Sequence, residues 1–282
     1  MLEEVIFGPV TMPGEIFRLL IAFAGTAVAA YYDIFNKRNV PDNYLYAFLA
    51  VAFLINVVFY EEDLFLFSMA VALFISGIAY VFYRVGQIGG ADVFVMASIM
   101  LLLPIQPSFV QIPFNIPFFF PVWLFSGIAL ALYVMISMGY KLIQTEAKPD
   151  WKYALMFIPY LLFAYVFINS MLFSIVYFAF VSIALFTTIF FMMFKQDLNR
   201  MLAEEMPVGQ LEAEDVLALE MMDQEVVKKN NINRLMTKDE ISRLKDLKIE
   251  DVWVFTKLPP FLPFILLGMV LAMFFSGLLF LM

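Results

Sequence analysis

Eight apolar segments run along the chain, and they restrict its fold more than any other feature of the sequence. Each is about as long as a helix that crosses the ~30 Å hydrocarbon core of a membrane. Helices are expected because a chain inside lipid must satisfy its own backbone hydrogen bonds. The sequence therefore predicts an all-α multi-pass membrane protein with about eight transmembrane helices, the range being six to eight. The segments are residues 16–32, 44–60, 64–83, 93–111, 117–139, 153–168, 171–194 and 260–281.

Two of the boundaries between segments depend on local breaks in long apolar stretches. Residues 93–140 contain no charged residue, but four prolines between positions 104 and 117 cannot belong to one uninterrupted helix. Residues 153–194 are expected to divide near Ile168–Ser170. Both stretches are long enough for two spans each.

The composition agrees with a membrane protein and excludes several kinds of chemistry. Charged residues make up 15% of the chain, against about 25% in a soluble domain. The chain has no Cys and no His, which excludes Ser-His and Cys-His nucleophiles and zinc-thiolate sites. An enzyme of this composition would draw its acid and base groups from Asp, Glu, Lys or Tyr. The net charge of -8 argues against a nucleic-acid partner.

The distribution of basic residues predicts the orientation in the membrane. With eight spans, sixteen of the seventeen Lys and Arg residues fall on one side, and Arg18 is the exception. Basic loops stay in the cytoplasm. We therefore expect both termini to be external and the loops after spans 1, 3, 5 and 7 to be cytoplasmic. The acidic stretch before the first span argues against a signal peptide, so that span is expected to be retained.

The polar stretch before the last apolar segment divides the chain into three parts. We expect a membrane domain over residues 1–194, a small soluble cytoplasmic insert over 195–258 and a final transmembrane helix over 259–282. Within the insert, residues 211–229 have the pattern of an amphipathic helix. Thr237 and Glu240 have capping-box spacing before a short helix. Residues 252–255 are typical of a brief strand.

Two carboxylates lie at the cytoplasmic ends of different spans. Asp33 closes the first span, and Asp92 opens the fourth after Gly89 and Gly90. Asp92 taken alone is a favoured helix N-cap, and Asp33 taken alone could pair with Lys37 or reach water. Asp33 nevertheless opposes the macrodipole of its own helix. Ionisable residues inside membrane spans are functional candidates by default, so two at one depth favour a functional site.

Paired carboxylates suit aspartyl proteolysis. Two like charges close together do not both ionise easily, so the pair holds a shared proton. The ionised group takes a proton from water, and the protonated group polarises the scissile carbonyl. Gly89 and Gly90 are expected to adopt a backbone conformation that other residues avoid, and to let a substrate approach closely. An ordinary loop would explain the two glycines as well.

Three stretches carry a resemblance to a known family. "GGAD", residues 89–92, opens a membrane helix and resembles the GxGD motif of membrane aspartyl proteases. "DIFNKRNVPDN", residues 33–43, resembles the region of the first aspartate in type IV prepilin peptidases. Residues 236–272 resemble the soluble tail and last helix of archaeal preflagellin and prepilin peptidases. The sequence thus resembles the archaeal preflagellin/type IV prepilin peptidases, most clearly over spans 1–4.

The resemblance implies a site, a substrate and a location. Asp33 and Asp92 would be the catalytic pair of an aspartic endopeptidase without cofactor or metal, and Gly89, Gly90 and Ala91 would form the active-site loop. The substrates would be pilin or archaellin precursors in the plasma membrane, cleaved after a short basic leader at the cytoplasmic face. Ala91 departs from the second glycine of GxGD, a variation that archaeal members tolerate. The four-Cys module of relatives that also methylate their products is absent.

Two other classes of function are compatible with the same residues. A proton-coupled carrier would use Asp33 and Asp92 as relay groups, but it would hold its carboxylates near the middle of the membrane. A non-catalytic assembly subunit would use the insert for docking. The insert has fourteen acidic and ten basic residues. Its acidity would attract a basic leader, although an ordinary solvated surface has the same composition.

Overall fold

The chain is mostly helical. The computed structural model describes residues 11–36, 39–110, 116–171, 173–247 and 249–280. Its apolar helices are α2 (Glu15–Phe35), α3 (Asp42–Val58), α4 (Glu62–Arg84), α5 (Gly90–Leu102), α6 (Phe119–Gln144), η1 (Trp151–Met156) continuing into α7 (Phe157–Ile168), α8 (Ile175–Met193), and α12 (Leu262–Phe275) continuing into η4 (Ser276–Phe280). A polar segment between α8 and α12 contains the remaining elements.

Five of these helices, within the described residues, are long and apolar enough to cross a membrane by length and composition. They are α2, α4, α6, the run from η1 through α7, and α8. The apolar helices α3, α5 and α12 are shorter. Each of the eight apolar segments of the sequence therefore contains a helix. The helical fold class with several candidate membrane spans is confirmed, whereas the count of eight crossings stays a prediction.

The fourth predicted span is too long at its C-terminal end. The sequence predicted a helix to residue 111, but α5 ends at Leu102. Pro104 follows two residues later and disfavours helical backbone in the residue before it. The carbonyls of Leu101 and Leu102 accept hydrogen bonds from the guanidinium of Arg18, each at 3.3 Å. The proline-rich break is confirmed in its described part, and residues 111–115 lie outside the described residues.

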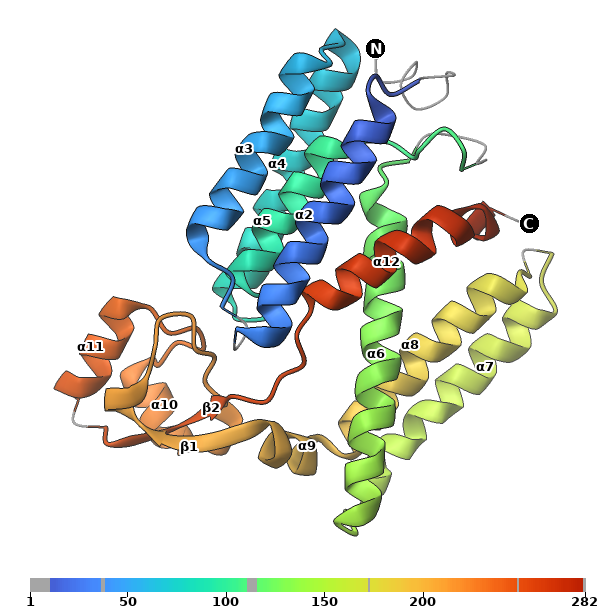
Figure 1. Ribbon diagram of the computed structural model, residues 1–282. Coiled ribbons are helices and arrows are strands. Elements are labelled where there is room, and N and C mark those ends of the chain that lie inside the picture. The colour runs from blue at the N-terminus through green and yellow to red at the C-terminus, as the bar shows by residue number, and fades with distance from the viewer. Residues whose placement is uncertain (1–10, 37–38, 111–115, 172, 248, 281–282) are drawn as a thin grey trace.

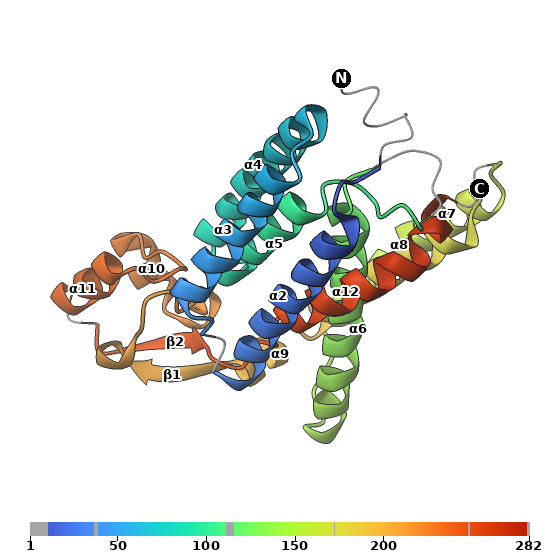
Figure 2. The same cartoon turned by 45° about the horizontal axis from the view of Figure 1, so that its top comes forward.

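Helices α2, α3 and α4 surround α5 on the left of Figure 1, and the same four helices stay together in Figure 2. Most of α5 is buried, including Val95, Met100 and Leu102. A helix that is apolar all round is expected to lie inside a protein. Three neighbours therefore fix the position of α5 and of its first turn, which carries Asp92.

Helix α12 crosses α6 at very close range, as Figure 1 shows. A Cβ atom on Gly268 of α12 would lie 2.0 Å from Oγ of Ser126 and 2.5 Å from the carbonyl oxygen of Val122. Small residues allow membrane helices to approach in this way. Gly268 thus fixes the distance between the two helices.

Replacing Gly268 with Ala is expected to destabilise the protein. The new methyl group would meet a backbone carbonyl that cannot move aside like a flexible side chain, and overpacking of this kind costs about 1–3 kcal/mol. Thermal unfolding in detergent would show a lower Tm. Gly127→Ala is the matched control, because no atom lies within 4 Å of a Cβ on Gly127. Equal Tm values for both variants would contradict this reading of the crossing.

Helices α7 and α8 form a hairpin beside α6 (Figure 1). The predicted division near Ile168–Ser170 is confirmed, because α7 ends at Ile168 and α8 starts at Ile175. No residue of α7 is buried. Its exposed side chains are apolar, among them Leu161 and Val166. Such a surface requires lipid or another protein against it.

The polar segment folds around a small core of its own. Its strands β1 (Ala203–Pro207) and β2 (Asp251–Phe255) pair antiparallel, with Ala203 opposite Phe255. Leu217, Met236 and Val254 are buried between the strands and the short helices. The predicted strand is confirmed. The other elements are α9 (Lys195–Leu202), η2 (Val208–Gln210), η3 (Leu219–Met221), α10 (Gln224–Asn230) and α11 (Lys238–Asp246). The domain boundaries at 194 and 258 stay a prediction.

The predicted amphipathic helix over residues 211–229 is wrong for most of its length. Val216 bridges to Leu235 and Leu217 to Val254, so extended backbone replaces helix there. Apart from the short 3-10 turn η3 (Leu219–Met221), α-helix begins only after Asp223, whose side chain accepts a hydrogen bond from the N–H of Glu225 at 2.8 Å. Pairing with neighbouring chain segments has overridden the helical pattern.

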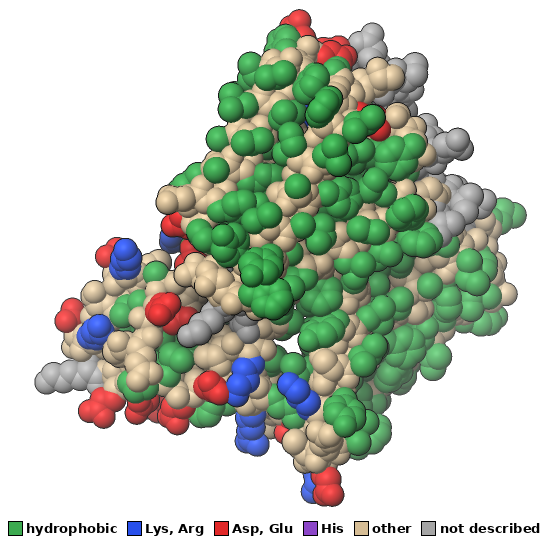
Figure 3. Space-filling view, viewed as in Figure 1, with side chains coloured by type: hydrophobic (Ala, Val, Ile, Leu, Met, Phe, Trp, Pro, Cys, Tyr) green, Lys and Arg blue, Asp and Glu red, His purple; other side chains and the backbone are tan. Residues whose placement is uncertain are grey.

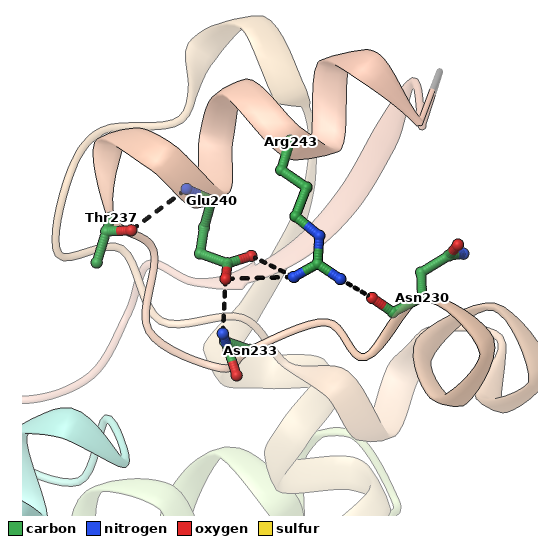
Figure 4. A network of polar contacts seen from close by, with 5 residues as sticks. All are labelled: Asn230, Asn233, Thr237, Glu240 and Arg243. Atoms are coloured by element: carbon green, nitrogen blue, oxygen red, sulfur yellow. Dashed lines mark hydrogen bonds and ion pairs between the residues drawn. The ribbon is translucent and has the colours of Figure 1, made fainter.

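The predicted cap of α11 is confirmed, but only half of the capping box forms. Oγ1 of Thr237 accepts a hydrogen bond from the N–H of Glu240 at 3.2 Å. Figure 4 shows that the carboxylate of Glu240 turns to Asn233 and Arg243 instead of reaching back to Thr237. Arg243 also donates to the carbonyl of Asn230. These contacts tie the segment after α10 to α11.

Charged and apolar side chains gather in different parts of the surface. On the face drawn in Figure 3, Lys and Arg side chains gather over the polar segment and the helix ends near it, whereas apolar side chains cover the helices. The predicted cluster of basic residues is therefore visible at one end of the molecule. Lys37, Arg38 and Lys248 belong to that prediction and lie outside the described residues.

Candidate active site

Asp33 lies in the last turn of α2 and is 7% exposed. Its Oδ2 accepts a hydrogen bond from the backbone N–H of Leu262 at 2.9 Å. Leu262 is the first residue of α12. The N-terminus of a helix favours a negative charge. Helix α12 therefore compensates for the unfavourable position of this carboxylate at the C-terminal end of α2.

Asp92 lies in the first turn of α5 and is also 7% exposed. It is the third residue of the helix, whereas Gly89 is the N-cap. Oδ2 of Asp92 accepts a hydrogen bond from the N–H of Gly89 at 2.9 Å. The reading of Asp92 as the N-cap itself is thus wrong by three positions. The side chain still serves a free backbone N–H at the start of the helix.

The two carboxylates come together at one end of the helices. The C-terminal end of α2 and the N-terminal ends of α5 and α12 meet on the side of the polar segment (Figures 1 and 2). Asp92 interacts electrostatically with Asp33. Both side chains are almost completely buried, although they are 59 positions apart in the sequence. The pair therefore combines like charge, burial and a helix N-terminus beside each member.

The glycines before Asp92 act through their lack of a side chain and not through an unusual backbone. Gly89 has φ −76° and ψ 156°, which any residue can adopt. The expected special conformation belongs instead to Gly86, at φ 73°. A Cβ on Gly89 would lie 3.3 Å from Oδ2 of Asp92, and one on Gly90 3.1 Å from Oε1 of Glu214. Ala91 follows as the second residue of α5.

A third carboxylate reaches this site from the polar segment. Oε1 of Glu214 accepts a hydrogen bond from the hydroxyl of Tyr83 in α4 at 3.0 Å. Glu214 also interacts electrostatically with Asp92. Glu214 was not predicted from the sequence, in which the acidity of the insert is its only signal. The N–H of Leu262 was missed too, although the two prolines before it indicate the start of a helix.

Within the residues that the structure describes, no three Asp, Glu, His or Cys side chains are grouped closely enough to hold a metal ion. The groups that the structure places at the site are the two carboxyl groups and the backbone N–H donors of Gly89 and Leu262.

These features define a multi-helix membrane protein with two buried carboxylates at one end of its helices. Residues 20–137 match the model of the type IV leader peptidase family, so this part of the chain is similar to that family. The match runs from within α2 to within α6 and includes both aspartates. Searches of curated proteins and of solved structures give no significant match. The resemblance to prepilin and preflagellin peptidases is thus confirmed at the level of the family.

Proposed function

We propose that the protein is a membrane aspartic endopeptidase that removes the short basic leader from pilin or archaellin precursors. The observation that carries the proposal is the buried pair Asp33 and Asp92 at one end of the helices. The family match over residues 20–137 supports the reaction class, because leader peptidases cut precursors of this kind. Separate incubation with each precursor type distinguishes a pilin substrate from an archaellin substrate.

The proposed reaction is hydrolysis of one peptide bond by the two carboxyl groups. The ionised aspartate removes a proton from water, whose oxygen bonds to the scissile carbonyl carbon. The protonated aspartate donates to the carbonyl oxygen, and the amide nitrogen leaves with a proton. The backbone N–H groups of Gly89 and Leu262 hold one oxygen of each carboxylate in place. This fixes the direction in which the other oxygens point.

The position of the pair suits a substrate that is itself partly in the membrane. The leader of such a precursor lies in the cytoplasm, and an apolar helix follows the cleavage point. We infer that the end of the helices carrying Asp33 and Asp92 faces the cytoplasm, that both termini lie outside, and that the membrane is the plasma membrane. The one-sided distribution of basic residues supports this orientation.

The carrier hypothesis gains no comparable support. A proton relay would place its carboxylates midway along the helices. Asp33 lies instead in the last turn of α2, and Asp92 lies in the first turn of α5. The geometry therefore favours the peptidase.

The test is cleavage of precursors by the purified protein in liposomes. Pilin and archaellin precursors would be incubated separately, and the products identified by mass spectrometry. Cleavage at a single bond directly after the basic leader is the expected result. Intact precursors of both kinds after prolonged incubation would refute the proposal. A substrate lacking its leader provides the control for unspecific proteolysis.

A further inference from the structure

The structure gives the polar segment a direct place at the active site through Glu214. This residue lies between η2 and η3, on a stretch tied by backbone hydrogen bonds to the segment before α11. The N–H of Glu214 donates to the carbonyl of Met236 at 2.8 Å, and the N–H of Met236 donates back to Asp215 at 2.8 Å. These two backbone hydrogen bonds fix the backbone at residue 214 and so limit where the side chain of Glu214 can reach.

The backbone of Glu214 is in the left-handed region, with φ 77°. Glycine is favoured there, whereas a residue with a bulky side chain is strained. Such strain accumulates where a side chain is needed in one direction. Here the direction is towards the membrane helices. Oε1 of Glu214 accepts a hydrogen bond from the hydroxyl of Tyr83. Gly90 leaves room for both carboxylate oxygens, because a Cβ atom on Gly90 would lie 3.3 Å from Oε2 of Glu214.

The carboxylate of Glu214 is placed to meet a cation. The residue is exposed, unlike Asp33 and Asp92. Among the ion pairs of the described residues, none involves Glu214. Asp33 and Asp92 share one proton in the proposed mechanism, so together with Glu214 they still form a negative group that attracts a positive one. A positive side chain arriving beside the catalytic pair would therefore find a partner already held in position.

A cavity lined by residues next to Met236, the backbone partner of Glu214, offers space for the chain that would carry this cation. This cavity of about 330 Å³ lies between the end of α4 and the polar segment. It is lined by Arg84, Asn233, Leu235, Thr237, Asp239 and Glu240. Leu235 directly precedes Met236, which holds the backbone of Glu214. Since Glu240 is already paired with Arg243, Asp239 and Arg84 are the charged groups left to face an occupant.

We propose that Glu214 recognises the basic side chain of the leader that lies nearest the scissile bond. This inference rests on the proposed peptidase function and adds a specificity-determining residue to it. Glu214 would act on binding of the precursor and not on the chemical step. The polar segment would then be the part of the enzyme that binds the basic residue of the leader and so selects precursors by charge.

The test separates the charge of Glu214 from its hydrogen bond to Tyr83. Glu214→Gln removes the charge but keeps an oxygen that accepts from Tyr83, whereas Tyr83→Phe removes the donor and keeps the charge. Glu212→Gln is the control, since Glu212 is acidic and exposed two positions away. Each variant would be assayed on a precursor with its natural leader and on one whose basic residue nearest the cleavage point is changed to Gln.

We expect Glu214→Gln to raise KM for the natural precursor about threefold to fivefold, the effect of one exposed ion pair. Its kcat should change little, and the neutral precursor should be cleaved as by the wild type. Glu214→Lys should in turn favour a precursor carrying Glu at that position.

Three results would overturn the assignment. One is an equal rise of KM for both precursors in Glu214→Gln, and another is the same rise of KM in Tyr83→Phe. Either would indicate that Glu214 only holds the polar segment against α4 and does not contact the leader. The third is wild-type kinetics in Glu214→Gln. Failure of the wild type itself to cleave any precursor would instead refute the peptidase function.

Discussion

Asp33→Asn and Asp92→Asn are each expected to abolish precursor cleavage. Asn has the shape of Asp and keeps an oxygen that can accept the hydrogen bond from Leu262 or Gly89. The fold should therefore survive, while the group that takes or gives a proton is lost. General acid-base groups contribute about 10²–10⁴-fold to a rate, and a pair acting together loses most of its effect when either member is removed. We expect at least about a 1000-fold fall in kcat/KM for each variant.

The measurement is the rate of product formation by reconstituted protein, with thermal unfolding recorded for every variant. Asp42→Asn is the matched control, because Asp42 is an exposed aspartate at the start of α3, at the same end of the helices. It should cleave at the wild-type rate. Full activity in either Asp33→Asn or Asp92→Asn would contradict the assignment of the two aspartates as catalytic residues. It would favour the hypothesis of a non-catalytic assembly subunit.

The sequence was informative about the membrane helices because hydrophobicity along a chain is a local property. All eight apolar segments contain helices, and the turn near Ile168–Ser170 is where polar residues interrupt the pattern. The error at the end of α5 has a non-local cause. The guanidinium of Arg18 in α2, more than eighty positions away, donates hydrogen bonds to the last carbonyls of α5. No property of residues 93–111 themselves indicates this.

The aspartates were found for a related reason. A charge in an apolar context is visible in the sequence, so Asp33 and Asp92 stood out individually. Their common depth followed from counting spans. Glu214 could not be found in this way, since it is one acidic residue among many in a polar stretch. Its relation to Asp92 depends on how residues 211–217 fold, and there the helical pattern gave the wrong secondary structure.

The partners of the two aspartates were also beyond the sequence. Gly89 was singled out for an unusual backbone, which it does not have. Its contribution is an N–H that points at Asp92. The N–H of Leu262 contacts Asp33 from 229 positions away. Backbone donors carry no residue-specific signal, so only the three-dimensional arrangement shows which ones reach a carboxylate.

Arg18 was the one basic residue that contradicted the positive-inside distribution, and the structure explains it. It is 1% exposed. Its guanidinium donates to Oδ1 of Asn56 at 2.9 Å and to the carbonyls of Pro13, Leu101 and Leu102. Those carbonyls lie at helix ends or in a turn, where no helical N–H reaches them. Arg18 therefore holds together the ends of α2, α3 and α5 at the side opposite the aspartates.

Arg18→Met is expected to be the most destabilising single change away from the aspartates. Met fills similar volume but leaves Oδ1 of Asn56 and the buried carbonyl of Leu102 without the donor that Arg18 supplies, as well as the partly buried carbonyl of Pro13, at about 1–3 kcal/mol for each unsatisfied group. A total loss of at least about 3 kcal/mol should lower Tm in detergent and reduce the yield of folded protein. The Tm of Arg18→Lys should lie between those of the wild type and Arg18→Met, because an ammonium group reaches fewer acceptors than a guanidinium group.

The matched control is Arg200→Met, since Arg200 is exposed on α9 and its loss should leave Tm almost unchanged. Asn56→Leu gives the reciprocal test. It removes the side chain that accepts from Arg18 and donates to Leu101 at 2.6 Å, so its effect and that of Arg18→Met should not add in the double variant. Additive losses would mean that the two residues stabilise separate parts of the bundle. If they do act together, Arg18 of α2 and Asn56 of α3 hold the C-terminal end of α5 as one unit, at the end of that helix opposite Asp92.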